Sequence, residues 1–88
     1  MNPTDMMNFT KETMARDLRG LVQQRETQIK LDNAMLRVLD MLVEKRPEDI
    51  KTKTVRDLTE FKRNQGKEEI ELFNKLIMNL EEEKEGQA

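Results

Sequence analysis

Apolar residues recur at helical spacing along most of this 88-residue chain, and the pattern predicts helices almost from end to end. The longest predicted helix covers residues 10–46. Pro47 ends it because the residue before a proline is pushed out of the α region. Residues 34–43 hold eight apolar side chains in ten, so this segment should lie in the core. No run of alternating β-branched residues occurs, and no strand is therefore expected.

A second helix is predicted over residues 54–64, after a connector over residues 47–53. Thr54 is its expected N-cap, and Gly66 is expected to end it by taking the left-handed conformation. Its apolar face, which should be buried, consists of Val55, Leu58 and Phe61. The second helix is thus expected to be short and amphipathic.

A third helix is predicted over residues 67–84, followed by a frayed tail over 85–88. Its buried face consists of Ile70, Phe73, Leu76, Ile77 and Leu80. The first helix is about 55 Å long, whereas the other two are about 18 and 27 Å, so they cover only part of it. We therefore expect one small all-α domain, in which the two shorter helices pack on the C-terminal half of the long N-terminal helix.

This arrangement leaves the N-terminal half of the long helix without a partner, which predicts a dimeric helical bundle or coiled coil. The residues expected to form the dimer seam are Met14, Leu18, Leu21, Val22, Arg25, Ile29, Asp32 and Leu36. Arg25 and Asp32 lie symmetrically about a midpoint between Gln28 and Ile29. An antiparallel pairing of two copies would bring each Arg25 to the second copy's Asp32, whereas a parallel one would stack like charges.

The residue types exclude most enzyme chemistry. The chain has no His, Cys, Ser, Trp or Tyr, so neither a nucleophile with its base nor a Cys/His zinc site can be assembled. Pairs of carboxylates such as Glu68 and Glu69 are interpreted as solvated helix faces, because acid–base chemistry needs a desolvated cleft. We therefore expect no enzymatic activity and no cofactor.

Charged residues make up 39% of the chain, and the two signs are separated along it. Residues 45–67 carry eight basic and four acidic side chains, whereas residues 68–88 carry two basic and seven acidic ones. The basic segment supplies a candidate patch for anions or nucleic acid, formed by Lys45, Arg46, Lys51, Lys53, Arg56, Lys62 and Arg63. Three interpretations stay open: a solvated or internally paired face, a phosphate-binding surface, and a surface for an acidic protein.

The N-terminal residues lack a basic segment followed by an apolar run, and the longest apolar run is three residues. Neither a signal peptide nor a membrane span is therefore expected, and the expected location is the cytoplasm. The predicted function is a small non-enzymatic protein–protein interaction module, acting as a homodimer in the role of adaptor, assembly chaperone or inhibitor. The alternative is a nucleic-acid-associated regulator that uses the basic segment 45–67.

Overall fold

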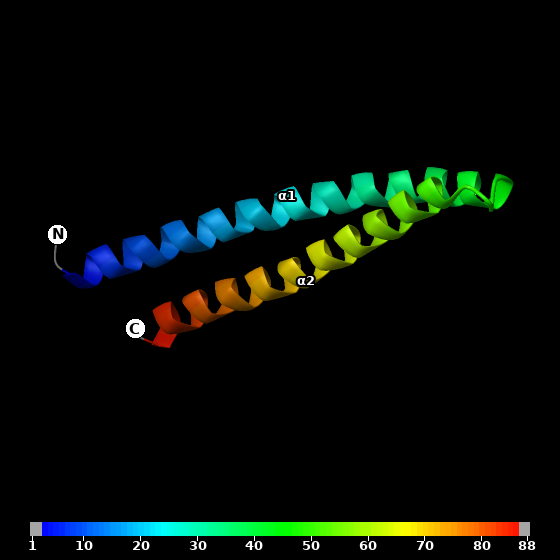
Figure 1. Cartoon of the computed structure of the whole chain (residues 1–88). Helices are drawn as coiled ribbons and strands as arrows, with labels where there is room; N and C mark the ends of the chain where they lie inside the picture. The colour runs from blue at the N-terminus through cyan, green and yellow to red at the C-terminus, as the bar shows by residue number, and fades with distance from the viewer. Residues whose placement is uncertain (1–2, 87–88) are drawn as a thin grey trace.

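The protein folds as an antiparallel hairpin of two long helices, according to a computed structural model that describes the backbone of residues 3–86 and the side chains of residues 10–82. Helix α1 spans Pro3–Lys45 and helix α2 spans Ile50–Gly86. The hairpin measures 65 × 18 × 15 Å. The turn lies at one end, and the first turn of α1 and the last turn of α2 lie together at the other (Figure 1). The prediction of an all-helical chain is confirmed, and the described residues contain no strand.

The turn between the helices is shorter than the predicted connector, and the residue that caps the N-terminus of α2 is not the predicted Thr54. The Arg46 backbone N–H donates to the Leu42 carbonyl at 2.9 Å and completes the last turn of α1. Asp49 caps α2, because its carboxylate accepts bonds from the Thr52 N–H at 3.3 Å and the Thr52 hydroxyl at 2.8 Å. Thr54, the predicted N-cap, lies inside α2 and donates its hydroxyl to the Ile50 carbonyl. The connector prediction of residues 47–53 is therefore wrong by about one helical turn.

Helix α2 continues through the point where two separate helices were predicted. Gly66 is helical, and no described residue has a positive φ. A glycine inside a helix costs about 1 kcal/mol relative to alanine, which is too little to break a helix that packs along its whole length. The predicted helices over 54–64 and 67–84 are thus one helix, and the three-helix arrangement is wrong.

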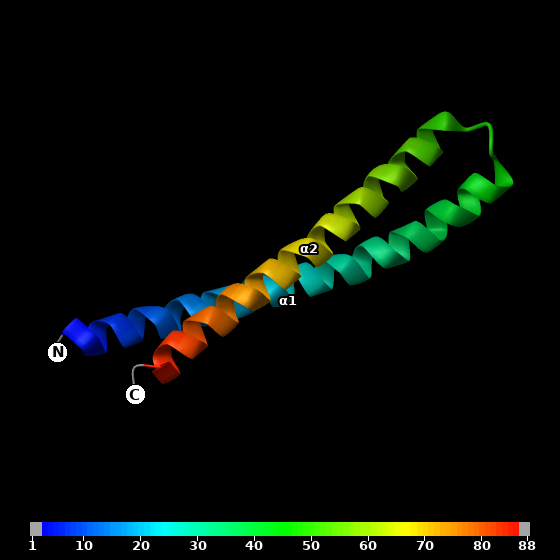
Figure 2. The same cartoon turned by 90° about the horizontal axis from the view of Figure 1, so that it is seen from below.

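The side chains between the helices follow alternating steps of three and four residues, which is the spacing of coiled-coil packing. The inward stripe of α1 consists of Ala15, Leu18, Val22, Arg25, Ile29, Asp32, Leu36, Leu39 and Val43. The inward stripe of α2 consists of Thr52, Arg56, Thr59, Arg63, Gly66, Ile70, Phe73, Ile77 and Leu80. Every one of these residues is buried or half-buried. In the view of Figure 2, α2 crosses α1 near the middle of the hairpin, as expected of helices that wind around each other.

Because α2 is a single long helix, it also reaches the part of α1 that was expected to lie bare. Ala15 and Val22 are buried, and Leu18 is half-buried. The expectation that this N-terminal half of α1 lacks a partner within the chain is therefore wrong. The error follows from the predicted break at Gly66, which made the second part of the chain too short to reach it.

The half of the hairpin nearer the turn has a polar interior on the α2 side. The inward residues there are the polar Thr52, Arg56, Thr59 and Arg63, together with Gly66. Leu58 and Phe61 point outward, with 62% and 64% of their surfaces exposed, and Val55 is exposed as well. The prediction that Val55, Leu58 and Phe61 form a buried face is therefore wrong. Buried apolar side chains among the described residues are limited to Ala15, Val22, Leu36, Leu39 and Ile77, each of which keeps 5–9% of its surface exposed.

Candidate protein interaction surface

One flank of the hairpin is closed by charged and polar side chains. Arg19 forms an ion pair with Glu81 near the open end. Near the turn, the Arg56 guanidinium donates to Asp40 at 2.8 Å and also pairs with Glu60. The Asp40 carboxylate, followed by Asp57 and Glu60, raises the pKa of Arg56 further above its ordinary value, so this side chain stays charged. We call this flank the polar flank.

The opposite flank presents apolar side chains to solvent. A groove on this side runs between α1 residues Leu31, Met35 and Val38 and the α2 residues Thr59 and Lys62. Val55 and Leu58 precede Lys62 by seven and four residues, so they lie on the same side of α2 as Lys62. We call this surface the apolar face, and it consists of Leu31, Met35, Val38, Leu42, Val55 and Leu58. All six side chains are exposed.

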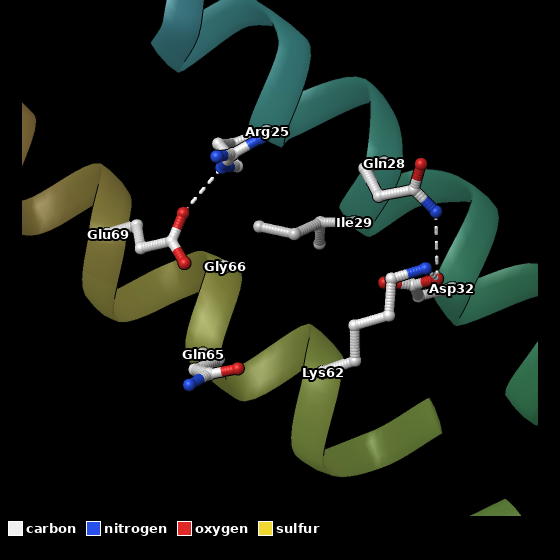
Figure 3. A pocket seen from close by; sticks show the side chains of 8 residues that line it. All are labelled: Arg25, Gln28, Ile29, Asp32, Lys62, Gln65, Gly66 and Glu69. Carbon is white, nitrogen blue, oxygen red and sulfur yellow. Dashed lines mark hydrogen bonds and ion pairs between the residues drawn. The ribbon is translucent and has the colours of Figure 1, made fainter. Parts of the chain in front are cut away.

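A layer of polar side chains interrupts the interior at the middle of the hairpin (Figure 3). The Gln28 amide donates to the Asp32 carboxylate at 3.1 Å, and the Lys62 ammonium lies 3.6 Å from the same oxygen. Asp32 is only 5% exposed, and these two groups compensate part of the loss of hydration of its charge. About two helical turns from Asp32 and Lys62, Arg25 donates to Glu69 at 2.5 Å. The layer therefore contains both signs of charge, paired between the helices.

A small cavity of about 130 Å³ lies within this layer. Gly66 and Ile29 line it from opposite helices, and a Cβ added at Gly66 would lie 3.5 Å from the Ile29 side chain, an ordinary contact distance. Gln28 and Gln65 both line the cavity, each from one helix. Figure 3 shows the paired side chains at its two sides, with Ile29 between them. A polar layer of this kind in an apolar interface typically fixes which residues of two helices face each other.

The structure places most of the predicted seam residues against α2 of the same chain. Six of the eight belong to the inward stripe of α1, namely Leu18, Val22, Arg25, Ile29, Asp32 and Leu36. Met14 and Leu21 lie beside this stripe and retain exposed surface. Arg25 finds its acidic partner in Glu69, within the chain. An antiparallel pairing of two copies stays a prediction, but it would have to use residues outside the inward stripe.

The predicted basic patch is divided into two groups. Arg56, Lys62 and Arg63 are held within the hairpin by Asp40, Asp32 and Asn33 respectively. The remaining four, Lys45, Arg46, Lys51 and Lys53, are exposed around the turn, and within the described residues no ion pair involves them. The structure thus leaves four cations of the predicted patch exposed at the turn, beside the acids Glu44, Glu48 and Asp49.

Comparison with protein families, with curated proteins and with solved structures finds no match to this chain. The described residues contain no group of three or more metal-ligating side chains. No helix in the described part has the length and apolarity that crossing a membrane would require.

Sequence reasoning missed the apolar face, although a signal for it was present. Leu31, Met35, Val38 and Leu42 follow each other at steps of four, three and four, which defines a second helical stripe beside the inward one. The segment 34–43 is apolar nearly all round for this reason. It was interpreted as a core enclosed by two helices, whereas only one helix covers it.

Proposed function

We propose that this chain is a non-enzymatic protein–protein interaction module whose working surface is the apolar face. The observation that supports this function is the asymmetry of the hairpin. One flank is satisfied by ion pairs between the helices, and the other presents six large exposed apolar side chains beside a groove. Contiguous exposed apolar surface rimmed by polar residues is typical of sites where another protein binds.

The energetics of the isolated hairpin favour a partner. A small chain gains little from a core with few fully buried side chains, and single domains of this size are only marginally stable. Complete burial of a Leu, Val, Met or Phe side chain contributes about 1.5–3 kcal/mol, and the side chains of the apolar face have about half of that still to gain. Association through this face would therefore add more stability than any rearrangement inside one hairpin.

The geometry of the face indicates the kind of surface that fits it. The apolar side chains lie along two antiparallel helices with a groove between them, so the complementary shape is another helix or pair of helices. Acting as a homodimer, the protein would keep its polar flanks and charged ends available to a further protein. Such an arrangement suits an adaptor, an assembly chaperone or an inhibitor.

The test uses the immobilised chain and a nuclease-treated extract of its own cells. Wild type is expected to retain a stoichiometric protein partner. A variant with Met35→Glu and Leu58→Glu is expected to lose it, because two charges would be buried in the contact. The matched control, Gln23→Glu with Asn64→Glu, changes the charge equally at exposed positions outside the apolar face. Equal retention by all three proteins would contradict the proposal.

The exposed cations at the turn favour a second candidate, a nucleic-acid-associated regulator. Lys45, Arg46, Lys51 and Lys53 gather there without an ion pair in the described part of the chain. Binding through them would weaken by about 0.7–0.9 log units per contacted phosphate for each log unit of salt. Tight binding of duplex or single-stranded nucleic acid at physiological salt, lost when these four residues are changed to Gln, would favour this candidate over the first.

A further inference from the structure

The outward side of α1 carries a stripe whose residues mirror one another about its centre. Met14, Leu21, Gln28, Met35 and Leu42 follow at steps of seven residues, so they lie in one line along the helix. All five retain exposed surface. Reversing the stripe about Gln28 places Met14 on Leu42 and Leu21 on Met35. The order apolar, apolar, polar, apolar, apolar is therefore the same in both directions.

Helix α2 carries a second stripe with the same property. Val55, Lys62, Glu69 and Leu76 also follow at steps of seven, and their midpoint lies between Gln65 and Gly66. Reversal about this midpoint places Val55 on Leu76. It also places Lys62 on Glu69, so that the mirrored charges are opposite in sign.

The two midpoints lie at the same level of the hairpin and on the same side of it. Gly66 lies opposite Ile29, the residue next to Gln28. Gln28, Lys62 and Glu69 line the central cavity together. Gln28, Met35 and Lys62 also share the groove of the apolar face. One two-fold axis through the cavity therefore relates both stripes to themselves.

We infer that a second copy of this chain covers the apolar face, antiparallel to the first, with the two turns at opposite ends and the two-fold axis at Gln28 and Gln65. In this four-helix bundle α1 lies on the second copy's α1, so that Leu21 meets Met35 and Met14 meets Leu42. Helix α2 lies on the second copy's α2, where Val55 meets Leu76. The inference rests on the proposed function, since both use the apolar face.

The charge distribution favours this direction over the alternative with both turns at one end. The turn carries the cations Lys45, Arg46, Lys51 and Lys53 and the acids Glu44, Glu48 and Asp49, an excess of one positive charge, whereas the acidic run Glu81–Glu83 lies near the opposite end of the hairpin. In the antiparallel arrangement each turn lies beside the acidic run of the other copy. With the turns together, the two positive excesses would face each other instead.

The polar layer gains a second role in this arrangement. Lys62, which already lies 3.6 Å from Asp32, meets the second copy's Glu69, which is itself bonded to Arg25 of its own chain. The axis repeats each of these contacts. Opposite charges then alternate across the centre of the bundle, and displacing one copy along the other by a helical turn would break the alternation. The layer thus fixes the register between copies as well as within one.

The test uses single-cysteine variants, for which the chain offers a clean background because it has no cysteine. Gln28→Cys places a thiol on the proposed axis and is expected to form a disulfide-linked dimer with itself on oxidation. In an equimolar mixture, Leu21→Cys and Met35→Cys are expected to give the mixed disulfide as the main product. Gln23→Cys is the matched control on the same helix, at an exposed position outside both stripes, and is expected to form no intermolecular disulfide under the same oxidation.

The alternative arrangement gives a different product. With both turns at one end, α1 lies on the second copy's α2, and Gln28→Cys would join Gln65→Cys rather than itself. A preference for that mixed product overturns the antiparallel arrangement.

A helical chain that sediments as a monomer at all concentrations overturns the inference that a second copy occupies the apolar face. If such a monomer still retains a partner through the apolar face, the proposed function stands without this inference. If the chain dimerises as inferred yet retains no further protein, its role in binding one is lost and the inference stands.

Discussion

Arg25 and Glu69 are 44 residues apart in the chain, and their side chains meet across the hairpin at its centre. This contact forms the side of the polar layer that lies toward the two ends of the chain. It also determines which acid compensates Arg25: the partner lies in the same chain, not at Asp32 of another copy.

The stability lost by reversing the charge of Arg25 is expected to return when the charge of Glu69 is reversed as well, and not when that of Asp32 is. Arg25→Glu places two carboxylates in contact and should lower the free energy of unfolding by about 1 kcal/mol, because both side chains are partly exposed and screened. Adding Glu69→Arg should restore most of this loss in urea titrations at a fixed protein concentration. Adding Asp32→Arg instead should not. Rescue by Asp32→Arg would indicate that the pairing across the hairpin is wrong.

Ile77 is expected to contribute far more to stability than its neighbour Met78. Ile77 is 7% exposed and faces α1, so Ile77→Ala should lower the free energy of unfolding by about 2–4 kcal/mol. Met78 is 58% exposed, and Met78→Ala should change it by less than about 0.5 kcal/mol. Both values are measurable by chemical denaturation. A larger loss for Met78 would mean that α2 is rotated relative to the structure.

Replacement of either helical glycine by alanine should stabilise the protein. At Gly20 an added Cβ meets no atom within 4 Å, so Gly20→Ala should add about 1 kcal/mol from helix propensity alone. At Gly66 the Cβ would make ordinary contact with Ile29, so Gly66→Ala should stabilise at least as much. Thermal unfolding by circular dichroism measures both. Destabilisation by Gly66→Ala would support the left-handed stop expected from the sequence.

The cap at Asp49 is expected to make stability depend on pH in the acidic range. The Thr52 hydroxyl, followed by the Thr52 backbone N–H, lowers the pKa of Asp49 below its ordinary value of 3.8. A folded-state pKa below the unfolded one stabilises the fold above the unfolded value. This stabilisation is lost as the pH falls through the folded value.

The comparison that isolates this effect is between wild type and Asp49→Asn, which keeps a capping oxygen but does not ionise. The advantage of wild type in the urea midpoint should be present at neutral pH and shrink as the pH is lowered below 3.8. Thr52→Val, which removes the hydroxyl donor, should reduce the same advantage. An advantage for wild type that grows on acidification would contradict the cap.

The sequence contained enough information to predict helices and the position of the turn, but not the side of α2 that faces inward. Pro47 and the apolar spacing of residues 10–46 are local signals: α1 ends at Lys45, one residue before the predicted end, although it begins at Pro3, seven residues before the predicted start. In α2 the apolar Val55 and Leu58 suggested an inward face, whereas the polar Arg56 and Arg63 occupy it. Periodicity identifies a stripe, but which of two stripes faces a neighbour depends on the acids that α1 offers to these arginines, such as Asp40.

The break predicted at Gly66 failed for a related reason. Glycine after a polar run is a frequent helix stop, and nothing local distinguishes that use from a close approach of two helices. The distinction lies in Ile29, whose side chain occupies the space beside Gly66 from far away in the sequence. Because a stop at Gly66 was predicted, α2 was expected to be too short to reach Val22, which in the structure is buried against it.

The polar interior near the turn has a consequence for the kinetics of folding. Thr52, Thr59 and Gly66 offer little apolar surface to α1, while the apolar residues of this half point outward. Collapse of one chain on itself therefore gains little there. If a second copy covers the apolar face as inferred above, the last step of folding is an encounter between two molecules. Refolding is then expected to be second-order, with a half-time that shortens continuously as the protein is made more concentrated.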